Sequence, residues 1–332
     1  MEYRPLGRTG VRVSQLCFGT MSFGAEADKA ASRAMYKKVR DMGVNFFDCA
    51  DAYTKGKAET ILGQLMKGER DNLVITSKCF NNLRGDINSG GGNRRHVAMA
   101  VEDSLKRLKT DRIDVLFMHR FEKLAPLEEV LRGLEDLVRA GKVLYIGASN
   151  YAAWQVAKAL GISEKNGWTK FDVIQPMYNL VKRQAEAEIF PQAQAEGMGV
   201  ITYSPVGGGM LSGKYRPGVQ PKVGRVKDKQ EYAVRYSDDW MLETAGRFTE
   251  FAEKVGIHPV TLAVAWVAAH PAVTAPIVGA RHTRQLAPSL KALDVKMTQD
   301  LWNEIANLSR TPAPATDRLE EYEPVTVRPV VG

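Results

Sequence analysis

Short apolar runs rich in β-branched and aromatic residues recur along the chain, and a helical pattern lies between each run and the next. This alternation is typical of a parallel sheet whose strands are joined by helices. We expect eight strands, at residues 15–20, 45–50, 73–79, 113–119, 143–149, 173–176, 199–205 and 273–279. Because eight such units can close on themselves and remove both sheet edges, the sequence predicts an α/β fold, the (β/α)8 TIM barrel.

Helical periodicity fills the intervals between these runs. In residues 127–139, for example, Leu127, Val130 and Leu134 fall on one stripe, with charged residues on the other face. We expect helices at residues 29–42, 58–66, 94–108, 127–139, 152–160, 185–195, 240–255, 259–268 and 283–293.

The length of 332 residues suggests about two domains, at roughly 150 residues each. Eight strand–helix units use most of the chain, so we instead predict a single barrel domain over 1–332, with a core at about 12–293 and a C-terminal helix and tail at 294–332. Two segments fall outside the pattern. Residues 207–238 form a long loop after strand seven, and the Pro-rich tail begins after Leu308. Each segment either covers a site or lies loosely on the surface.

Composition excludes several classes of protein. With 44% hydrophobic and 25% charged residues, the chain is typical of a globular protein. It has no apolar run near the ~18 residues of a membrane span and begins with a charged segment, so we expect a cytoplasmic location and no membrane. Cys17, Cys49 and Cys79 lack the spacing of a zinc site, and we expect no metal. The net charge of +8 suggests that the chain binds nucleic acid or a phosphorylated ligand. The basic clusters of the chain look like solvated faces, so we expect no nucleic acid.

Ionisable side chains end three consecutive strands of the expected barrel. Asp48 ends the second strand and Tyr53 follows it, while Lys78 ends the third and His119 the fourth. Because the sites of such barrels form at the carboxyl ends of the strands, we expect these side chains to meet. Asp48 can supply the counter-charge that a buried Lys78 needs. We expect Lys78 to stabilise the phenolate of Tyr53, whose usual pKa is near ~10, so that the phenol protonates an alkoxide beside a neutral His119.

The sequence resembles the aldo-keto reductases from residue 3 to about 293. The motifs that carry the resemblance are GVNFFDCADAY, LVITSKC, IDVLFMHR, KVLYIGASN, FDVIQPMYNLVKR, GVITYSPVGGGMLSGKY and PIVGARHTRQL. The resemblance implies a barrel that uses NADPH without a Rossmann domain. It implies Tyr53 as general acid, Asp48 and Lys78 as the groups that tune it, and His119 as the group that orients the substrate carbonyl.

The resemblance also implies a cofactor site. Ser149, Asn150 and Gln175 would bind the nicotinamide carboxamide, Tyr203 would stack on the ring, and Arg281 would bind the 2′-phosphate of NADP(H). The full set of cofactor-binding residues that we expect is Gly19, Thr20, Met21, Asp48, Ser149, Asn150, Gln175, Tyr203, Ser204, Pro205, Val206, Gly207, Leu211, Gly213, Lys214, Gly279, Ala280, Arg281, Gln285 and Ser289.

The chain departs from the family near the adenine site, where Pro288 and Ser289 stand in place of the common acidic residue and Asn. Since proline has no N–H, we expect the last helix either to begin later or to be distorted in its first turns. Thr54 follows Tyr53 where glycine is common, and we expect the rim of the site to be affected.

Aromatic residues near the expected site favour bulky or aromatic carbonyl substrates over charged sugars. The substrate-binding residues that we expect are Phe23, Tyr53, Phe80, His119 and Phe121. Two functions remain open. The first is the reversible, NADPH-dependent reduction of a small aldehyde or ketone. The alternative is a cofactor-binding, redox-sensing regulatory subunit that resembles potassium-channel β subunits.

Overall fold

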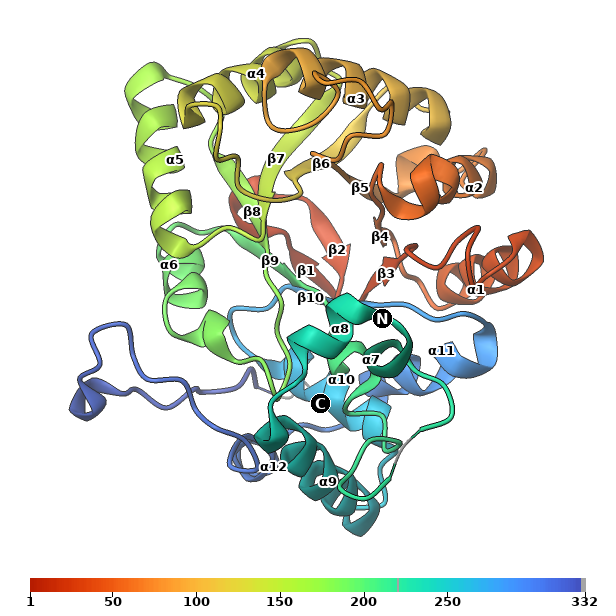
Figure 1. The fold of residues 1–332 in the computed structure, drawn as a ribbon, viewed down its shortest axis with the longest axis vertical. Helices are drawn as coiled ribbons and strands as arrows, with labels where there is room; N and C mark the ends of the chain where they lie inside the picture. Colours follow the sequence, from red (N-terminus) through yellow and green to blue (C-terminus); the bar gives the residue numbers. More distant parts are fainter. Residues whose placement is uncertain (220, 330–332) are drawn as a thin grey trace.

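Eight parallel strands form a closed barrel in the computed structural model, which describes residues 1–219 and 221–329 (Figure 1). The strands are β3 (Cys17–Gly19), β4 (Phe46–Asp48), β5 (Val74–Cys79), β6 (Ile113–Met118), β7 (Val143–Ser149), β8 (Phe171–Gln175), β9 (Gly199–Thr202) and β10 (Ala275–Val278). Strand β10 pairs with β3 on one side and with β9 on the other, which closes the cylinder. The predicted (β/α)8 barrel is confirmed, and each expected strand overlaps an observed one.

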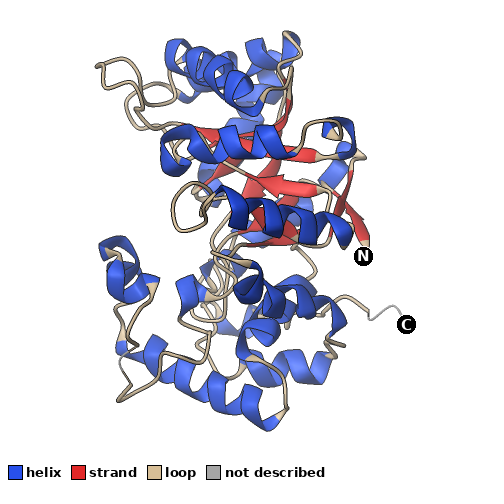
Figure 2. Ribbon diagram, turned by 90° about the vertical axis from the view of Figure 1, so that its right-hand side faces the viewer, coloured by secondary structure: helices blue, strands red, loops and turns tan. Residues whose placement is uncertain are grey.

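Helices cover the outside of the strands (Figure 2). They are α1 (Lys29–Asp41), α2 (Lys57–Leu65), α3 (Arg94–Leu108), α4 (Leu127–Arg139), α5 (Ala153–Asn166), α6 (Ile189–Ala195), α9 (Asp239–Lys254), α10 (Pro259–Ala269), α11 (Thr283–Leu290) and α12 (Gln299–Ala306). The predicted bounds of α3 and α4 are confirmed. Helix α5 continues past Gly161, before which we expected it to end, because that glycine does not have the positive φ of a helix stop.

The barrel interior is filled by its own apolar cluster. Side chains from the strands, including Phe46, Val115 and Phe117, meet Leu6 and Val13 there. Leu6 and Val13 come from a hairpin of β1 (Tyr3–Pro5) and β2 (Arg12–Ser14), which the sequence analysis did not predict. The turn after Leu6 lies against the first residues of β9, so the hairpin covers the amino-terminal end of the barrel. Polar site residues are therefore left to the carboxyl end.

The two segments outside the pattern differ in structure. The 207–238 segment contains two short helices, α7 (Arg225–Asp228) and α8 (Gln230–Arg235), and its Gln220 lies outside the described residues. The tail after Leu308 is largely irregular, and Arg328 near its end donates to the carbonyls of Pro271 and Val273, which precede β10. The described end of the tail thus lies at the amino-terminal end of the barrel. Residues 330–332 of the tail lie outside the described residues.

Among residues 1–219 and 221–329, no helix is both long enough and apolar enough to cross a bilayer.

Two helical glycines give a paired test of the packing. A Cβ on Gly63 of α2 would lie 2.5 Å from the backbone of Leu108, whereas a Cβ on Gly161 of α5 would meet nothing within 4 Å. We expect Gly63→Ala to lower the free energy of unfolding by about 1–3 kcal/mol through overpacking. We expect Gly161→Ala to raise it by up to about 1 kcal/mol, because alanine restricts the unfolded chain. Urea unfolding measures both, and equal effects at the two sites would contradict the packing of α2 on α3.

Candidate active site

A buried ion pair lies at the carboxyl end of β4 and β5. The ammonium nitrogen of Lys78 is 2.7 Å from each carboxylate oxygen of Asp48 and 2.8 Å from the carbonyl oxygen of Cys49. Lys78 is 1% exposed and Asp48 is 2% exposed. Burial disfavours the ammonium, but the charge of Asp48 and the hydrogen bonds raise the pKa of Lys78 above its ordinary value. Lys78 therefore stays charged.

Further bonds fix the Asp48 carboxylate. One oxygen accepts hydrogen bonds from Thr76 Oγ1 and from Gln175 Nε2, each at 2.8 Å. We expected Gln175 to bind a cofactor amide; it lines the cavity above, and its own amide also donates to Asp48. With these bonds the carboxylate has little freedom to rotate away from Lys78.

The hydroxyl of Tyr53 is the fourth partner of Lys78, at 3.1 Å. The next two residues, Thr54 and Lys55, have φ values of 51° and 52°, in the left-handed region that favours glycine. Thr54 Oγ1 donates to the carbonyl oxygen of Phe23 at 3.0 Å, which helps to hold this conformation. The positive φ explains why glycine is preferred after the tyrosine. Thr54 therefore lies in a strained turn beside the phenol.

Burial raises the pKa of Tyr53 above its ordinary value, and the nearby Lys78 opposes the shift without cancelling it. The expected stabilisation of the phenolate by Lys78 is present, but burial outweighs it, and a sequence shows the neighbouring cation without the extent of burial. The raised pKa keeps the phenol protonated near neutral pH. Tyr53 therefore holds a proton that it can donate to a substrate.

His119 follows β6 and faces Tyr53, with the two rings edge to face and 6.2 Å between their centroids. Burial, together with the positive charges of Lys78 and Arg120, lowers the pKa of His119 to about 3. Its backbone carbonyl accepts a hydrogen bond from Asn150 Nδ2 at 2.9 Å. The imidazole is therefore neutral, as expected, and can act as a hydrogen-bond donor.

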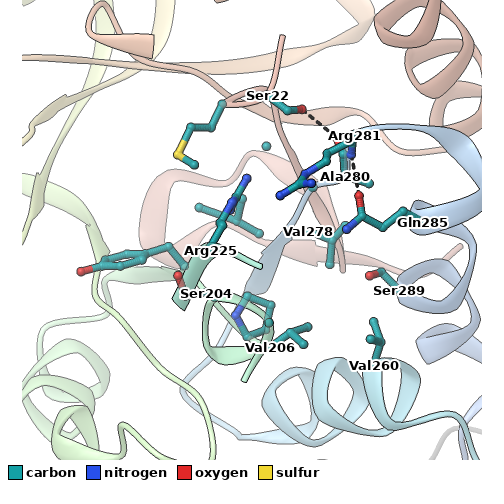
Figure 3. Close-up of a pocket in the computed structure, with 18 of the residues that line it drawn as sticks. Ser22, Ser204, Val206, Arg225, Val260, Val278, Ala280, Arg281, Gln285 and Ser289 are labelled. Atoms are coloured by element: carbon teal, nitrogen blue, oxygen red, sulfur yellow. Dashed lines mark hydrogen bonds between the residues drawn. The ribbon is translucent and has the colours of Figure 1, made fainter. Parts of the chain in front are cut away.

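A cavity of about 870 Å³ opens above these residues (Figure 3). Asp48, Tyr53 and His119 line one part of it. Most of the expected cofactor residues also line it, namely Gly19, Met21, Ser149, Asn150, Gln175, Tyr203, Ser204, Pro205, Val206, Lys214, Gly279, Ala280, Arg281, Gln285 and Ser289. The structure thus brings together residues from strands β3, β4 and β7 to β10.

Four expected cofactor residues lie outside this lining. Thr20 is fully buried and donates to the carbonyl oxygen of Asp48, and Leu211 is part of the apolar core. Gly207 is buried, and Gly213 packs beside Pro259 of α10. These four residues support the loops that form the cavity without facing it, because neighbouring residues in a turn point in different directions.

Three of the aromatic residues expected to bind substrate also lie outside the cavity lining. Phe23 is fully buried against Phe18, at 5.9 Å between ring centroids, and this corrects its expected place in a substrate pocket. Phe80 lies under the guanidinium of Arg120, and Phe121 packs on Tyr151 and Trp154. Phe80 and Phe121 follow β5 and β6, so they lie near His119 at the rim of the barrel rather than in the cavity lining.

Five cations line the part of the cavity away from Tyr53. They are Lys214, Arg225, Arg235, Arg281 and Arg284, and none of them forms an ion pair within the described residues. Asp48 is the acidic residue in the described lining. Burial and the charges of Arg281 and Arg225 lower the pKa of Lys214. Figure 3 shows Arg225 and Arg281 projecting toward the same region. This end of the cavity is suited to an anion.

Sequence reasoning missed three of these cations. Arg225 and Arg235 are held over the ring of Tyr232, with 5.8 Å and 5.0 Å to its centroid. The cation-rich composition of the segment after β9 was the available signal. Arg284 lies in the first turn of α11, three residues after the predicted Arg281.

Helix α11 begins at Thr283, the first residue of the range predicted for it, so the later start that Pro288 suggested is wrong. His282 caps it by accepting from the backbone N–H of Gln285, whose side chain accepts from the N–H of Arg281. Pro288 lies in the last turn of the helix, two residues before its end, and its carbonyl accepts a hydrogen bond from Thr261. The proline therefore does not delay the helix, and the cap leaves Arg281 at its start.

Within residues 1–219 and 221–329, no three His, Cys, Asp or Glu side chains lie close enough together to hold a metal ion. The three cysteines are buried and free.

Comparison with known proteins supports a common origin for this arrangement. The sequence model of the aldo/keto reductase family matches residues 15–310. An uncharacterized oxidoreductase of Bacillus subtilis, YrpG, is 34% identical over 97% of this chain and 99% of its own. A probable voltage-gated potassium channel subunit beta of Oryza sativa subsp. japonica is 36% identical over 89% of this chain and 92% of its own. Versiconal hemiacetal acetate reductase of Aspergillus parasiticus is 32% identical over 90% of this chain and 94% of its own.

One carboxylate beside the site should make folding stability depend on pH. Burial and the nearby Glu59 raise the pKa of Asp51 to about 7, and neither of its carboxylate oxygens has a hydrogen bond within the described residues. An unfolded aspartate has a pKa near 3.9, so the folded state binds the extra proton between about pH 4 and pH 7. The contribution of Asp51 to the free energy of unfolding is therefore most favourable at low pH, and it is lost as pH rises through this window.

We expect Asp51→Asn to remove that loss. Relative to the natural protein, the variant should gain on the order of 4 kcal/mol in unfolding free energy between about pH 4 and pH 8, as measured by urea unfolding at each pH. Asp41→Asn, at an exposed residue of α1, is the control. A difference between Asp51→Asn and the natural protein that stays constant with pH would contradict the shift.

Proposed function

The chain belongs to the aldo/keto reductase family, and we propose that it is an NADP(H)-dependent enzyme that reversibly reduces an aldehyde or ketone to the alcohol. Membership identifies an oxidoreductase that acts on C=O and CH–OH groups with a nicotinamide cofactor. One observation carries the proposal for this chain. A buried, charged Lys78 bonds both the Asp48 carboxylate and the Tyr53 hydroxyl on the floor of a large cavity.

The proposed chemistry assigns a separate task to each residue. The reduced nicotinamide, when bound, supplies a hydride to the carbonyl carbon. Neutral His119 donates a hydrogen bond that orients the carbonyl oxygen, and Tyr53 donates its proton to that oxygen as negative charge develops. Lys78, at 3.1 Å, stabilises the phenolate that remains, and Asp48 holds Lys78 in place.

The cations of the cavity fit a dinucleotide phosphate. Their charges face one cavity with no carboxylate partner in the described residues, so a ligand with several negative charges would relieve their repulsion. Arg281, at the start of α11, would hold the 2′-phosphate of NADP(H). Tyr203 and Asn150 both line the cavity, and the Tyr203 hydroxyl donates to Asn150 Oδ1 at 2.7 Å. In this position Tyr203 would contact the nicotinamide ring.

The rim near His119 favours apolar substrates. Phe121 packs on Trp154, which is 61% exposed, and Phe80 lies on the neighbouring loop. We propose that aromatic or bulky aldehydes and ketones bind between this rim and Tyr53. A panel of carbonyls with NADPH and of alcohols with NADP⁺ tests the substrate class and the direction together.

A second candidate follows from one relative. The similarity to a protein named as a probable potassium channel subunit beta permits a regulatory role in which the bound cofactor reports redox state to a partner. Very slow turnover across the whole panel, with tight retention of NADPH, would favour that role. Rapid turnover of any carbonyl in the panel favours the reductase.

We expect Tyr53→Phe to lower kcat by at least about 10²–10⁴-fold, because the proton donor is lost, while the Kd for NADPH stays the same. Loss of NADPH absorbance measures turnover, and fluorescence quenching measures binding. Tyr145→Phe is the control, since this hydroxyl bonds Thr9 near the amino-terminal end of the barrel. Turnover by Tyr53→Phe at the natural rate would refute the proposed mechanism.

We expect Arg281→Ala to raise the Kd for NADPH by about 10- to 100-fold and to change the Kd for NADH little, because a charge-assisted contact to one phosphate is lost. Titration of each cofactor measures both constants. Arg132→Ala, on the surface of α4, serves as the control. Equal weakening for NADPH and NADH would show that Arg281 does not contact the 2′-phosphate.

A further inference from the structure

The two ring nitrogens of His119 have different surroundings. Nδ1 lies 3.4 Å from Nδ2 of Asn81, on the loop after β5. Nε2 makes no hydrogen bond with any described residue, and His119 lines the cavity. A neutral imidazole carries one proton, so it can donate to a substrate in the cavity only if that proton is on Nε2. Which nitrogen carries it is therefore decisive for the proposed function.

Arg120 fixes the orientation of the Asn81 amide. Its guanidinium donates to Asn81 Oδ1 at 2.9 Å and lies over the ring of Phe80, 5.2 Å from the centroid. A guanidinium can only donate, so the amide oxygen must face Arg120, and the amide nitrogen must face His119. The reverse orientation would place two donors against each other.

We propose that Asn81, oriented by Arg120, holds neutral His119 in the tautomer that carries its proton on Nε2. An amide nitrogen donates and does not accept, so Nδ1 of His119 must present its lone pair to Asn81. The remaining proton is then on Nε2. Asn81 is a positioning residue, because it touches His119 and lies outside the lining of the large cavity.

The charges around the ring are consistent with a single proton. Lys78 and Arg120 are both positive and disfavour a second proton on His119. Asp48 is occupied by Lys78, and the phenol of Tyr53 is neutral while it is protonated. With the doubly protonated ring disfavoured, the contact with Asn81 selects between the two neutral tautomers.

Nitrogen NMR of the full-length protein labelled with ¹⁵N-histidine reports the proton on each ring nitrogen directly. The chain has five histidines, and His119→Gln identifies the signals of His119 by their loss. Between about pH 6 and pH 8, we expect His119 to show a protonated Nε2 and a bare Nδ1. A protonated Nδ1, or an average of the two tautomers, would overturn the proposal.

Asn81→Asp provides the sharper test, because a carboxylate accepts where the amide donates. We expect Nδ1 of His119 to gain a proton in this variant. Asn82→Asp makes the same chemical change at the next residue, whose amide bonds the carbonyl of Asp86, and should leave His119 unchanged. A bare Nδ1 in Asn81→Asp, or an equal change in Asn82→Asp, would overturn the proposal.

The NMR experiment reads the tautomer without turnover, so it can refute the tautomer assignment independently of the proposed function. The catalytic role of the tautomer rests on that proposed function. For Asn81→Asp near neutral pH, we expect kcat to fall by about 10- to 100-fold with an unchanged Kd for NADPH, because the donor on Nε2 is lost. The loss should lessen as pH falls, since a doubly protonated ring carries a proton on Nε2 again. A reversed tautomer with full kcat would refute the role of His119 as donor and leave the tautomer assignment standing.

Discussion

The structure of the site depends on one interaction, the ion pair between Lys78 and Asp48. Two charges in an apolar barrel are costly unless each is matched by partners at close range. Lys78 has four such contacts, and its carboxylate partner also bonds Thr76 and Gln175. The register makes this possible, because Asp48 pairs with Thr76 on the adjacent strand, two residues before Lys78, and side chains two residues apart on a strand point to the same face.

Stability and chemistry are divided between the two ends of the barrel. The amino-terminal end is covered by a hairpin whose Leu6 and Val13 complete an apolar interior. The carboxyl end holds the buried ion pair, a strained turn at Thr54 and Lys55, and cations that form no ion pair within the described residues. Part of the net charge of +8 therefore has a definite place, and it includes Arg225, Arg235 and Arg284, which the sequence did not single out.

Periodicity and strand ends could be read from the sequence, whereas burial could not. The alternation of strands and helices predicted the barrel, and polar residues at the ends of apolar runs predicted the meeting of Asp48, Lys78 and His119. The direction of a side chain in a loop does not follow from any such period, which is why Phe23 and Leu211 were assigned to binding roles although they lie in the core. The pKa of Tyr53 could not be predicted because burial and charge act in opposite directions, and only a structure gives their balance.

The central claim is that the ion pair makes Tyr53 an effective proton donor, and Lys78→Met tests it most directly. The protein would be loaded with NADPH and mixed rapidly with an aromatic aldehyde, and the first turnover would be followed by NADPH absorbance. The account predicts a first turnover at least about 100-fold slower than in the natural protein, with NADPH still bound, because the developing phenolate loses its counter-charge. An equally fast first turnover in Lys78→Met would contradict it.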